Sequence, residues 1–240
     1  MLVVTDRRIP DAAQKTLIDR GATLIKLPPH PALPAPVASH PDLLLFFAPD
    51  AICCTESYQK VAAPELELIC AAIKKPIRTV SEELGATYPK DILLNAAPVG
   101  NVLFCHPTHT ARTVREHPAY HTLPVRQGYT KCSTLPVGDQ ALITEDPSIT
   151  AAATARGIEV LQISKGAVTL KGYDTGFLGG ASSFSPYGAY REILFCGALE
   201  CHPDAKRIRD FCNRHGYGVT SLSDEPLCDV GTMFVFDLIT

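Results

Sequence analysis

A lysine next to a cysteine is the first feature of this sequence that suggests chemistry. Lys131 and Cys132 stand in the segment GYTKCST, residues 128–134. An ammonium group beside a thiol favours the thiolate, which is the nucleophilic form of cysteine. In a regular strand the two side chains would point to opposite faces, so both would reach one site only through a bulge. The alternative is that Cys132 is a buried thiol without a chemical role.

Four aspartates stand at comparable places near the start of apolar, strand-like runs: Asp42, Asp91, Asp174 and Asp229. If these runs converge, the four carboxylates meet Lys131. Repulsion would then make at least one carboxylate take up a proton unless a cation lies among them. A guanidinium or amine ligand would supply that cation, and Lys131 would supply part of the charge. The alternative is that each aspartate only caps a strand end or a turn.

His40 lies two residues before Asp42 and is the only histidine among these five positions. An imidazole with a pKa near neutrality can act as a general acid or base. The hypothesis is therefore that Cys132 and His40 form a nucleophile and a base contributed by two distant parts of the chain.

Two histidine pairs raise the question of a metal site. Their members are three or four residues apart, a spacing that places both side chains on one face of a helix. Proline interrupts both segments, and no carboxylate or CxxC motif completes a tetrahedral ligand set. We therefore expect surface histidines, no metal site and no cofactor. The pairs are His106 with His109 and His117 with His121.

A repeated unit supplies the elements that would position these residues. An apolar strand, a polar turn, a helix and a second strand recur, and prolines and glycines mark the expected helix starts and ends. The copies cover residues 2–27, 141–163 and 193–222, with weaker ones at 51–71 and 101–125; the markers are Pro10, Pro107, Pro147 and Pro203, and Gly21, Gly157 and Gly216.

One further strand-like run precedes four of the copies, and the end of the chain supplies the fifth. The run heads, which are the four aspartates and Lys131, are spaced by about 40–55 residues around the whole chain. The predicted fold is α/β, a five-bladed pseudo-fivefold ββαβ propeller closed by the N- and C-terminal strands, which leaves no open edge. The alternative is an ordinary α/β sandwich. The single domain 1–240 would comprise units 227–240 plus 1–27, 39–71, 88–125, 128–163 and 172–222.

Composition narrows the class of partner. The net charge is −3 and no basic cluster occurs, so no nucleic acid is expected. The longest apolar run, Leu43–Ala48, is too short to span a membrane, and charge at Asp6 comes too early for a signal peptide. Nine cysteines without a CxxC pair indicate free thiols in the cytoplasm. The oligomeric state stays undetermined.

Several segments together resemble the pentein superfamily of guanidino-group-modifying enzymes, which includes arginine deiminases and amidinotransferases, and more closely a bacterial family assigned to that fold. These segments are the HPD at 40–42, GYTKCS, GYDTGFLGG at 172–180 and the terminal DVG. The resemblance implies a ring of five units and a central pocket in which a cysteine attacks the guanidinium carbon. It matches Asp91 to a substrate-binding carboxylate, but it places Gly172 where the family has histidine, and Gly231 or Thr232 where it has the cysteine.

The sequence therefore predicts a central acidic pocket for a small cationic molecule with a guanidino or amine group. If the protein is an enzyme, the reaction would be hydrolysis or transfer at a C–N bond, with Cys132 or, by a shifted register, Cys228 as the nucleophile. The alternatives are a binding protein without catalysis, which the substitution at Gly172 favours, and a protein that interacts with a macromolecule.

Overall fold

A computed structural model describes residues 1–188 and 190–237 of the chain. The two ends of the chain share one sheet. Strand β1 (Leu2–Asp6) pairs antiparallel with β15 (Met233–Phe236) and parallel with β2 (Thr23–Leu27). The short strand β12 (Ser183–Phe184) extends this sheet by pairing parallel with β15. The last three residues of the expected terminal unit, 238–240, lie outside the described residues.

Three other sheets repeat the same pairing, in which the central strand is antiparallel to the strand before it and parallel to the strand after it. Their strands are β3 (Phe46–Phe47), β4 (Ile52–Thr55) and β5 (Ile77–Val80); β6 (Ala97–Val99), β7 (Val102–Cys105) and β8 (His121–Pro124); and β9 (Thr134–Pro136), β10 (Ala141–Thr144) and β11 (Glu159–Gln162). In the fifth sheet β13 (Glu192–Phe195) pairs parallel with β14 (Gly218–Ser221), and a single antiparallel bridge joins Ser182 to Phe195.

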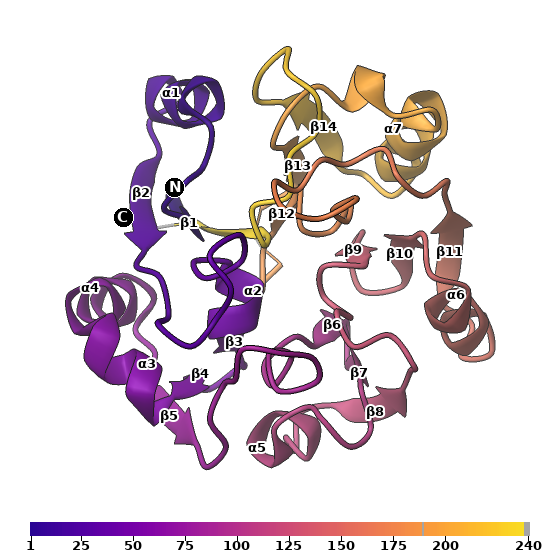
Figure 1. The fold of residues 1–240 in the computed structure, drawn as a ribbon. Helices are drawn as coiled ribbons and strands as arrows, with labels where there is room; N and C mark the ends of the chain where they lie inside the picture. The colour runs from indigo at the N-terminus through magenta and orange to yellow at the C-terminus, as the bar shows by residue number, and fades with distance from the viewer. Residues whose placement is uncertain (189, 238–240) are drawn as a thin grey trace.

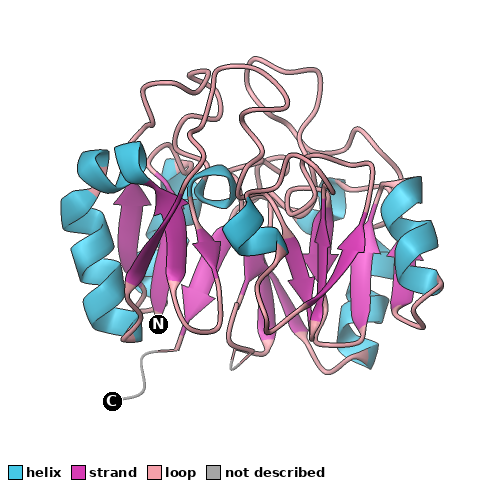
Figure 2. Cartoon of the chain, turned by 90° about the horizontal axis from the view of Figure 1, so that it is seen from below, coloured by secondary structure: helices cyan, strands magenta, loops and turns pink. Residues whose placement is uncertain are grey.

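The longer helices connect the parallel strands of each unit and lie on the outside of the molecule, while the short α2 (Pro41–Leu44) lies near the common centre that the sheets surround (Figure 1). The helices are α1 (Asp11–Asp19), α2 (Pro41–Leu44), α3 (Glu56–Val61), α4 (Ala63–Ile73), α5 (Arg112–Arg115), α6 (Pro147–Thr154), α7 (Ala205–Arg214) and the 3₁₀ turn η1 (Leu199–Cys201). Long loops gather on one side of the sheets and tight turns on the other (Figure 2). We call these sides the loop face and the turn face.

The helix signals of the sequence are partly confirmed. Pro147 is the first residue of α6, and the three expected C-terminal glycines have positive φ angles, the conformation that favours glycine there. The helix predicted from Pro107 is wrong, because α5 begins only at Arg112. Residues after Pro107 instead form a turn in which the Thr108 N–H donates to His106 Nδ1, at 3.4 Å.

The prediction that the five head residues lie in strands is also wrong. Asp42 lies in the single helical turn α2, and the other heads lie in loops or turns that precede the short strands. Lys131 and Cys132 belong to a turn rather than to a strand, so the alternation of strand faces does not separate them. Polar heads satisfy their hydrogen bonds better in turns than in a ladder between two neighbouring strands.

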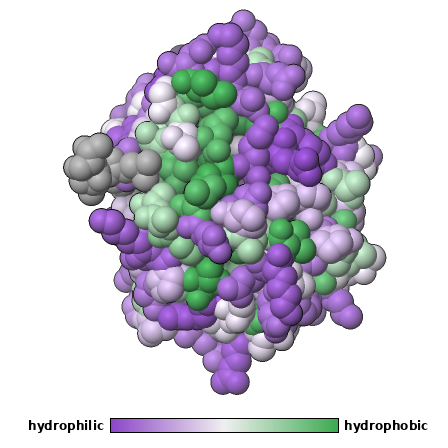
Figure 3. All heavy atoms as spheres, turned by 90° about the vertical axis from the view of Figure 1, so that its left-hand side faces the viewer, coloured by the Kyte–Doolittle hydropathy of each residue, from purple (hydrophilic) through white to green (hydrophobic). Residues whose placement is uncertain are grey.

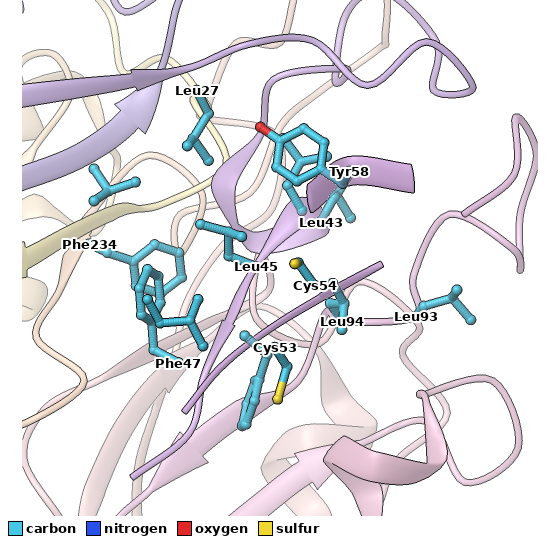
Figure 4. Packing of buried hydrophobic residues seen from close by; sticks show 14 of the residues in the cluster. Leu27, Leu43, Leu45, Phe47, Cys53, Cys54, Tyr58, Leu93, Leu94 and Phe234 are labelled. Atoms are coloured by element: carbon cyan, nitrogen blue, oxygen red, sulfur yellow. The ribbon is translucent and has the colours of Figure 1, made fainter. Parts of the chain in front are cut away.

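Apolar side chains fill the space between the sheets. Around α2 and β3 the core includes Leu45, Phe47 and Phe234, with the Phe47 and Phe234 rings 4.7 Å apart (Figure 4). Apolar residues also reach the surface on the side that carries α1 and α4 (Figure 3), where Ile18 and Leu68 are exposed. Among the described residues, no helix has the length and apolar character needed to cross a membrane.

Candidate functional site

Asp42 is the centre of a buried polar cluster. Its backbone N–H donates to Gly231 O at 3.0 Å, which fixes α2 against the loop before β15. Carboxylate oxygen Oδ2 lies 3.1 Å from the Cys132 sulfur and 3.0 Å from Thr232 Oγ1. The other oxygen, Oδ1, is buried and has no hydrogen-bond partner among the described residues. Burial raises the pKa of the Asp42 carboxyl, and the nearby Lys131 charge opposes that rise.

Lys131 places a cation inside the same cluster. Its side chain is buried, and Nζ donates to Thr232 Oγ1 at 3.1 Å and to Thr134 O at 3.3 Å. The ammonium also lies 5.2 Å from the centre of the Phe184 ring. Burial lowers the pKa of Lys131 to about 8, although the Asp42 carboxylate acts in the opposite direction. A substantial fraction of this amine is therefore neutral in mildly alkaline solution.

Cys132 is held as a thiol between a donor and an acceptor. Sγ donates to Asp42 Oδ2, and the Asn95 side-chain amide donates to Sγ at 3.2 Å. Asn95 Oδ1 also accepts from the Lys131 backbone N–H at 2.7 Å, which holds the turn in place. Burial and the negative charge of Asp42 raise the pKa of the thiol well above its ordinary value. The expectation that Lys131 favours the thiolate is therefore not supported, because burial and the nearby carboxylates dominate the pKa of this thiol and both favour its protonated form.

Thr232 joins the two sides of the cluster in an unusual backbone conformation. Its φ angle is +67°, which a β-branched residue rarely adopts. The hydroxyl lies 3.0 Å from both Asp42 Oδ2 and Gly179 O, and its single proton can serve only one of them at a time. Strained positions of this kind gather at functional sites. Thr232 is one of the two residues, with Gly231, at which the pentein resemblance would place the nucleophile.

His40 belongs to a neighbouring group of buried charges. Nδ1 lies 3.8 Å from Asp229 Oδ1 and Nε2 lies 3.7 Å from Asp6 Oδ2. Burial lowers the pKa of His40, which favours the neutral imidazole. Among the described residues, no hydrogen bond joins His40 to Cys132. The structure therefore does not join the two residues into the pair suggested by the sequence.

Asp229 and Cys228 lie beside His40. Asp229 accepts backbone N–H groups from Phe177 and Gly231, both at 2.9 Å, while burial raises the pKa of its carboxyl. Cys228 is half-buried and its sulfur lies 3.8 Å from the Asp229 backbone oxygen. Burial raises the pKa of this thiol too. Neither thiol is therefore held as a thiolate.

The remaining two aspartates lie in different environments. Asp91 is buried, and its Oδ2 accepts from the Tyr129 hydroxyl at 2.6 Å, while Oδ1 has no partner among the described residues. Asp174 lies in an exposed loop. The structure thus brings Asp42 and Lys131 together, places Asp229 nearby, and leaves Asp174 at the surface.

A small cavity borders the buried cluster of Asp42 and Lys131. Its volume is about 10 Å³, roughly enough for one water molecule. Asp42 and Lys131 line it together with apolar side chains that include Phe184 and Phe234. At Asp42 and Lys131 the open central pocket expected from the sequence is therefore reduced to this void. In the described part of the chain, no three metal-ligating side chains cluster in the way a metal ion requires.

Sequence reasoning missed two residues of these clusters. Asn95 closes the predicted segment 88–95 and contacts both Lys131 and Cys132. Asp6 ends strand β1 and is bound by the Arg8 guanidinium at 2.7 Å. Each of the two residues lies at the end of a predicted strand, and this position was the sequence feature that could have marked it as a candidate site residue.

Comparison with solved structures identifies the class of fold. The chain is similar to DDAH from Pseudomonas aeruginosa, solved as a cysteine-to-serine mutant complexed with citrulline; the identity is 9%, the match covers 93% of this chain and 92% of that chain, and the TM-score is 0.56. It is also similar to agmatine deiminase from C. jejuni, with 10% identity, coverage of 92% and 75%, and a TM-score of 0.50. The chain therefore has a mixed α/β fold of the pentein type, as the sequence resemblance predicted.

A sequence family is established as well. The chain belongs to the family described as Family of unknown function (DUF6873), whose model matches residues 4–234. No curated protein matches the chain. The likeness to the solved structures concerns the fold, because the same fold supports different activities.

Proposed function

We propose that this protein binds a small cationic molecule, with an amine or guanidino group, at Asp42 on the axis of a five-bladed ββαβ propeller closed by its terminal strands. The observation that carries the proposal is the buried Oδ1 atom of Asp42, which has no hydrogen-bond partner among the described residues. The Asp42 side chain also lines the small void described above. A buried acceptor without a donor is costly, and an N–H group of a ligand would remove that cost.

Charge in the cluster favours the same ligand class. Asp42 and Asp229 are both buried, and the negative charge of each raises the pKa of the Cys132 thiol. The charge of Asp42 also raises the pKa of the Asp229 carboxyl. Lys131 is the internal cation that offsets part of this charge, and its lowered pKa lets it lose a proton when a second cation arrives. We expect the affinity for a guanidino compound, which stays charged, to rise as the pH increases from 7 to 9.

The direct test is ligand binding by an isosteric variant. Arginine, agmatine, citrulline and methylated arginines are titrated against the wild-type chain and Asp42→Asn by calorimetry and by thermal shift. Binding at a concentration 100 times Kd would stabilise the folded state by about 2.7 kcal/mol. The shift should vanish in Asp42→Asn and persist in Asp19→Asn, an exposed control on α1. Equal shifts in both variants would refute the assignment to Asp42.

A second candidate is catalysis at a C–N bond, which the 3.1 Å contact between Cys132 Sγ and Asp42 favours. Sγ would bond to the guanidino carbon as its proton passes to the carboxylate, an amine would leave with a proton, and water would then release the product from sulfur. The test measures ammonia or amine release by Cys132→Ser and Cys228→Ser. Activity lost only in Cys132→Ser would support this reaction, and activity retained in both would exclude both thiols as nucleophiles.

A further inference from the structure

The loop face of the axis is closed by backbone. A Cβ added at Gly179 would lie only 2.5–2.6 Å from the carbonyl oxygens of Lys131, Cys132 and Thr134. A Cβ at Gly231 would lie 2.3 Å from the His40 side chain. At Gly179 main chain is therefore packed against main chain, and at Gly231 the backbone is packed against His40. Opening that side would require loops to separate, because the contacts at Gly179 are between backbone atoms that no rotamer change can move.

These loops are also joined by hydrogen bonds. The Thr232 N–H donates to Gly180 O at 2.8 Å, and the Gly180 N–H donates to Cys132 O at 3.0 Å. The Asp42 N–H donates to Gly231 O. These bonds join the segments that precede β3, β9, β12 and β15. Moving one segment away would leave several buried polar groups without partners.

The turn face, in contrast, carries a pocket of about 390 Å³ that shares lining residues with the void at Asp42. This volume falls within the usual range for small-molecule sites. Turns after β6, β9 and β12 supply its walls, and its described lining includes four tyrosines and two carboxylates: Tyr120, Tyr187, Tyr190, Tyr217, Asp139 and Glu192. Tyrosine rings and carboxylates attract organic cations. We call this space the tyrosine pocket.

Phe184 separates the tyrosine pocket from the void at Asp42. Phe184 and Pro98 line both spaces, while Asp42 and Lys131 line only the void. The Phe184 ring is half-buried and ends the two-residue strand β12, after which the described chain has no regular structure up to Gly188. A rotamer change of one side chain is far less costly than separation of the loops.

We infer that the cation of the proposed function reaches Asp42 from the turn face, through the tyrosine pocket, with the Phe184 side chain as the gate. The inference rests on the proposed function for the identity of the ligand. It adds a requirement on the shape of the ligand, because the amine or guanidino head must be carried by a tail that lies in the tyrosine pocket. Agmatine and arginine, with flexible alkyl chains, have this form.

Lys131 provides a readout of access that needs no ligand. Its pKa near 8 leaves about half of the amine neutral at pH 8, against roughly one part in three hundred for an ordinary lysine. Reductive methylation with formaldehyde and a borane, followed by peptide mass spectrometry, measures its exposure. In the wild type we expect Lys131 to be protected, and in Phe184→Ala we expect its methylation to be more than about tenfold faster.

The matched control removes an aromatic ring from the opposite side. Phe177→Ala takes away a half-buried ring on the loop face and should leave Lys131 protected. Methylation that is equally fast in Phe177→Ala, or unchanged in Phe184→Ala, would overturn the proposed route. Phe184→Leu, which keeps an apolar side chain and so perturbs folding less, is tested as well, with circular dichroism as the check on folding. It should give a smaller increase of the same sign.

A blocking variant separates this inference from the proposed function. Ser185→Trp adds bulk to the wall of the tyrosine pocket and should slow the association of agmatine measured by stopped flow, with Asp42 intact. Slower association in Ser185→Trp supports the route, and an unchanged association rate with intact binding refutes it. If Phe184→Ala exposes Lys131 but agmatine neither binds nor protects it, the route stands and the proposed function fails.

Discussion

The sulfur of Cys132 donates a hydrogen bond to the Asp42 carboxylate at 3.1 Å, although 90 residues separate the two along the chain. This contact decides the state of the thiol. A carboxylate beside a thiol opposes its deprotonation, and burial acts in the same direction, so the ammonium of Lys131 does not activate the sulfur. In a typical thiol enzyme the nucleophile is held in an electropositive, accessible environment.

Alkylation of Cys132 should therefore be slow. With iodoacetamide at pH 7.5, we expect Cys132 to react at least about tenfold more slowly than the exposed Cys201, as measured by peptide mass spectrometry over time. Asp42→Asn removes the negative charge and should increase the Cys132 rate, whereas Asp19→Asn should not. A rate for Cys132 equal to that of Cys201 in the wild type would contradict the buried, protonated thiol.

Removal of Lys131 should destabilise the protein. Lys131→Met removes the buried charge that favours ionisation of the Asp42 carboxyl and takes a hydrogen-bond donor away from Thr232 Oγ1 and Thr134 O, which should cost about 1–3 kcal/mol. Combining Lys131→Met with Asp42→Asn should restore a large part of that loss. Urea unfolding of the two single variants and the double variant measures the coupling. Strictly additive losses would show that the two residues do not interact.

Glu145 should make stability depend on pH in a specific window. Its side chain is buried directly after β10, and Oε1 has no hydrogen-bond partner among the described residues. Burial raises the pKa of the carboxyl from 4.5 to about 7. The Lys165 charge opposes this rise, and the negative charges of Asp229 and Asp146 add to it. The folded state then binds more protons than the unfolded state between pH 4.5 and 7, so this group makes stability fall as pH rises through that range.

Glu145→Gln tests this dependence. At pH 8 the variant should be more stable than the wild type by about 1–3 kcal/mol, because the cost of burying a charge is removed. At pH 4, where the carboxyl is protonated in both states, the gain should disappear. Urea unfolding at several pH values measures both, with the exposed Glu67→Gln as the control. A gain that is the same at pH 4 and pH 8 would contradict the raised pKa.

Thr232 should be sensitive to loss of its hydroxyl. Thr232→Ala leaves Lys131 Nζ and Asp42 Oδ2 each without one buried partner, which should cost about 1–3 kcal/mol in urea unfolding. Thr232→Ser keeps the hydroxyl and removes the β-branch that strains a positive φ angle. The serine variant should therefore be close to the wild type. A serine variant as unstable as the alanine variant would show that the methyl group, not the hydroxyl, matters.

Local features of the sequence determined much of the secondary structure and the repeat. Gly21, Gly157 and Gly216 end helices because glycine tolerates the left-handed conformation that a helix end requires. The apolar runs predicted to pair at the chain ends do pair, as Leu2 opposite Phe236 demonstrates. Such features depend on neighbouring residues and on burial patterns, which the order of amino acids carries directly.

Only the tertiary structure decided which polar groups meet. Asp42 and Asp174 look alike as heads of a repeat, yet one is buried beside Lys131 and the other lies in an exposed loop. Asn95 closes a predicted strand, but only the tertiary structure shows that it organises the turn that holds Cys132. The reason is that hydrogen bonds act over about 3 Å, so loop packing between residues distant in sequence sets the partners and the pKa values of these polar groups.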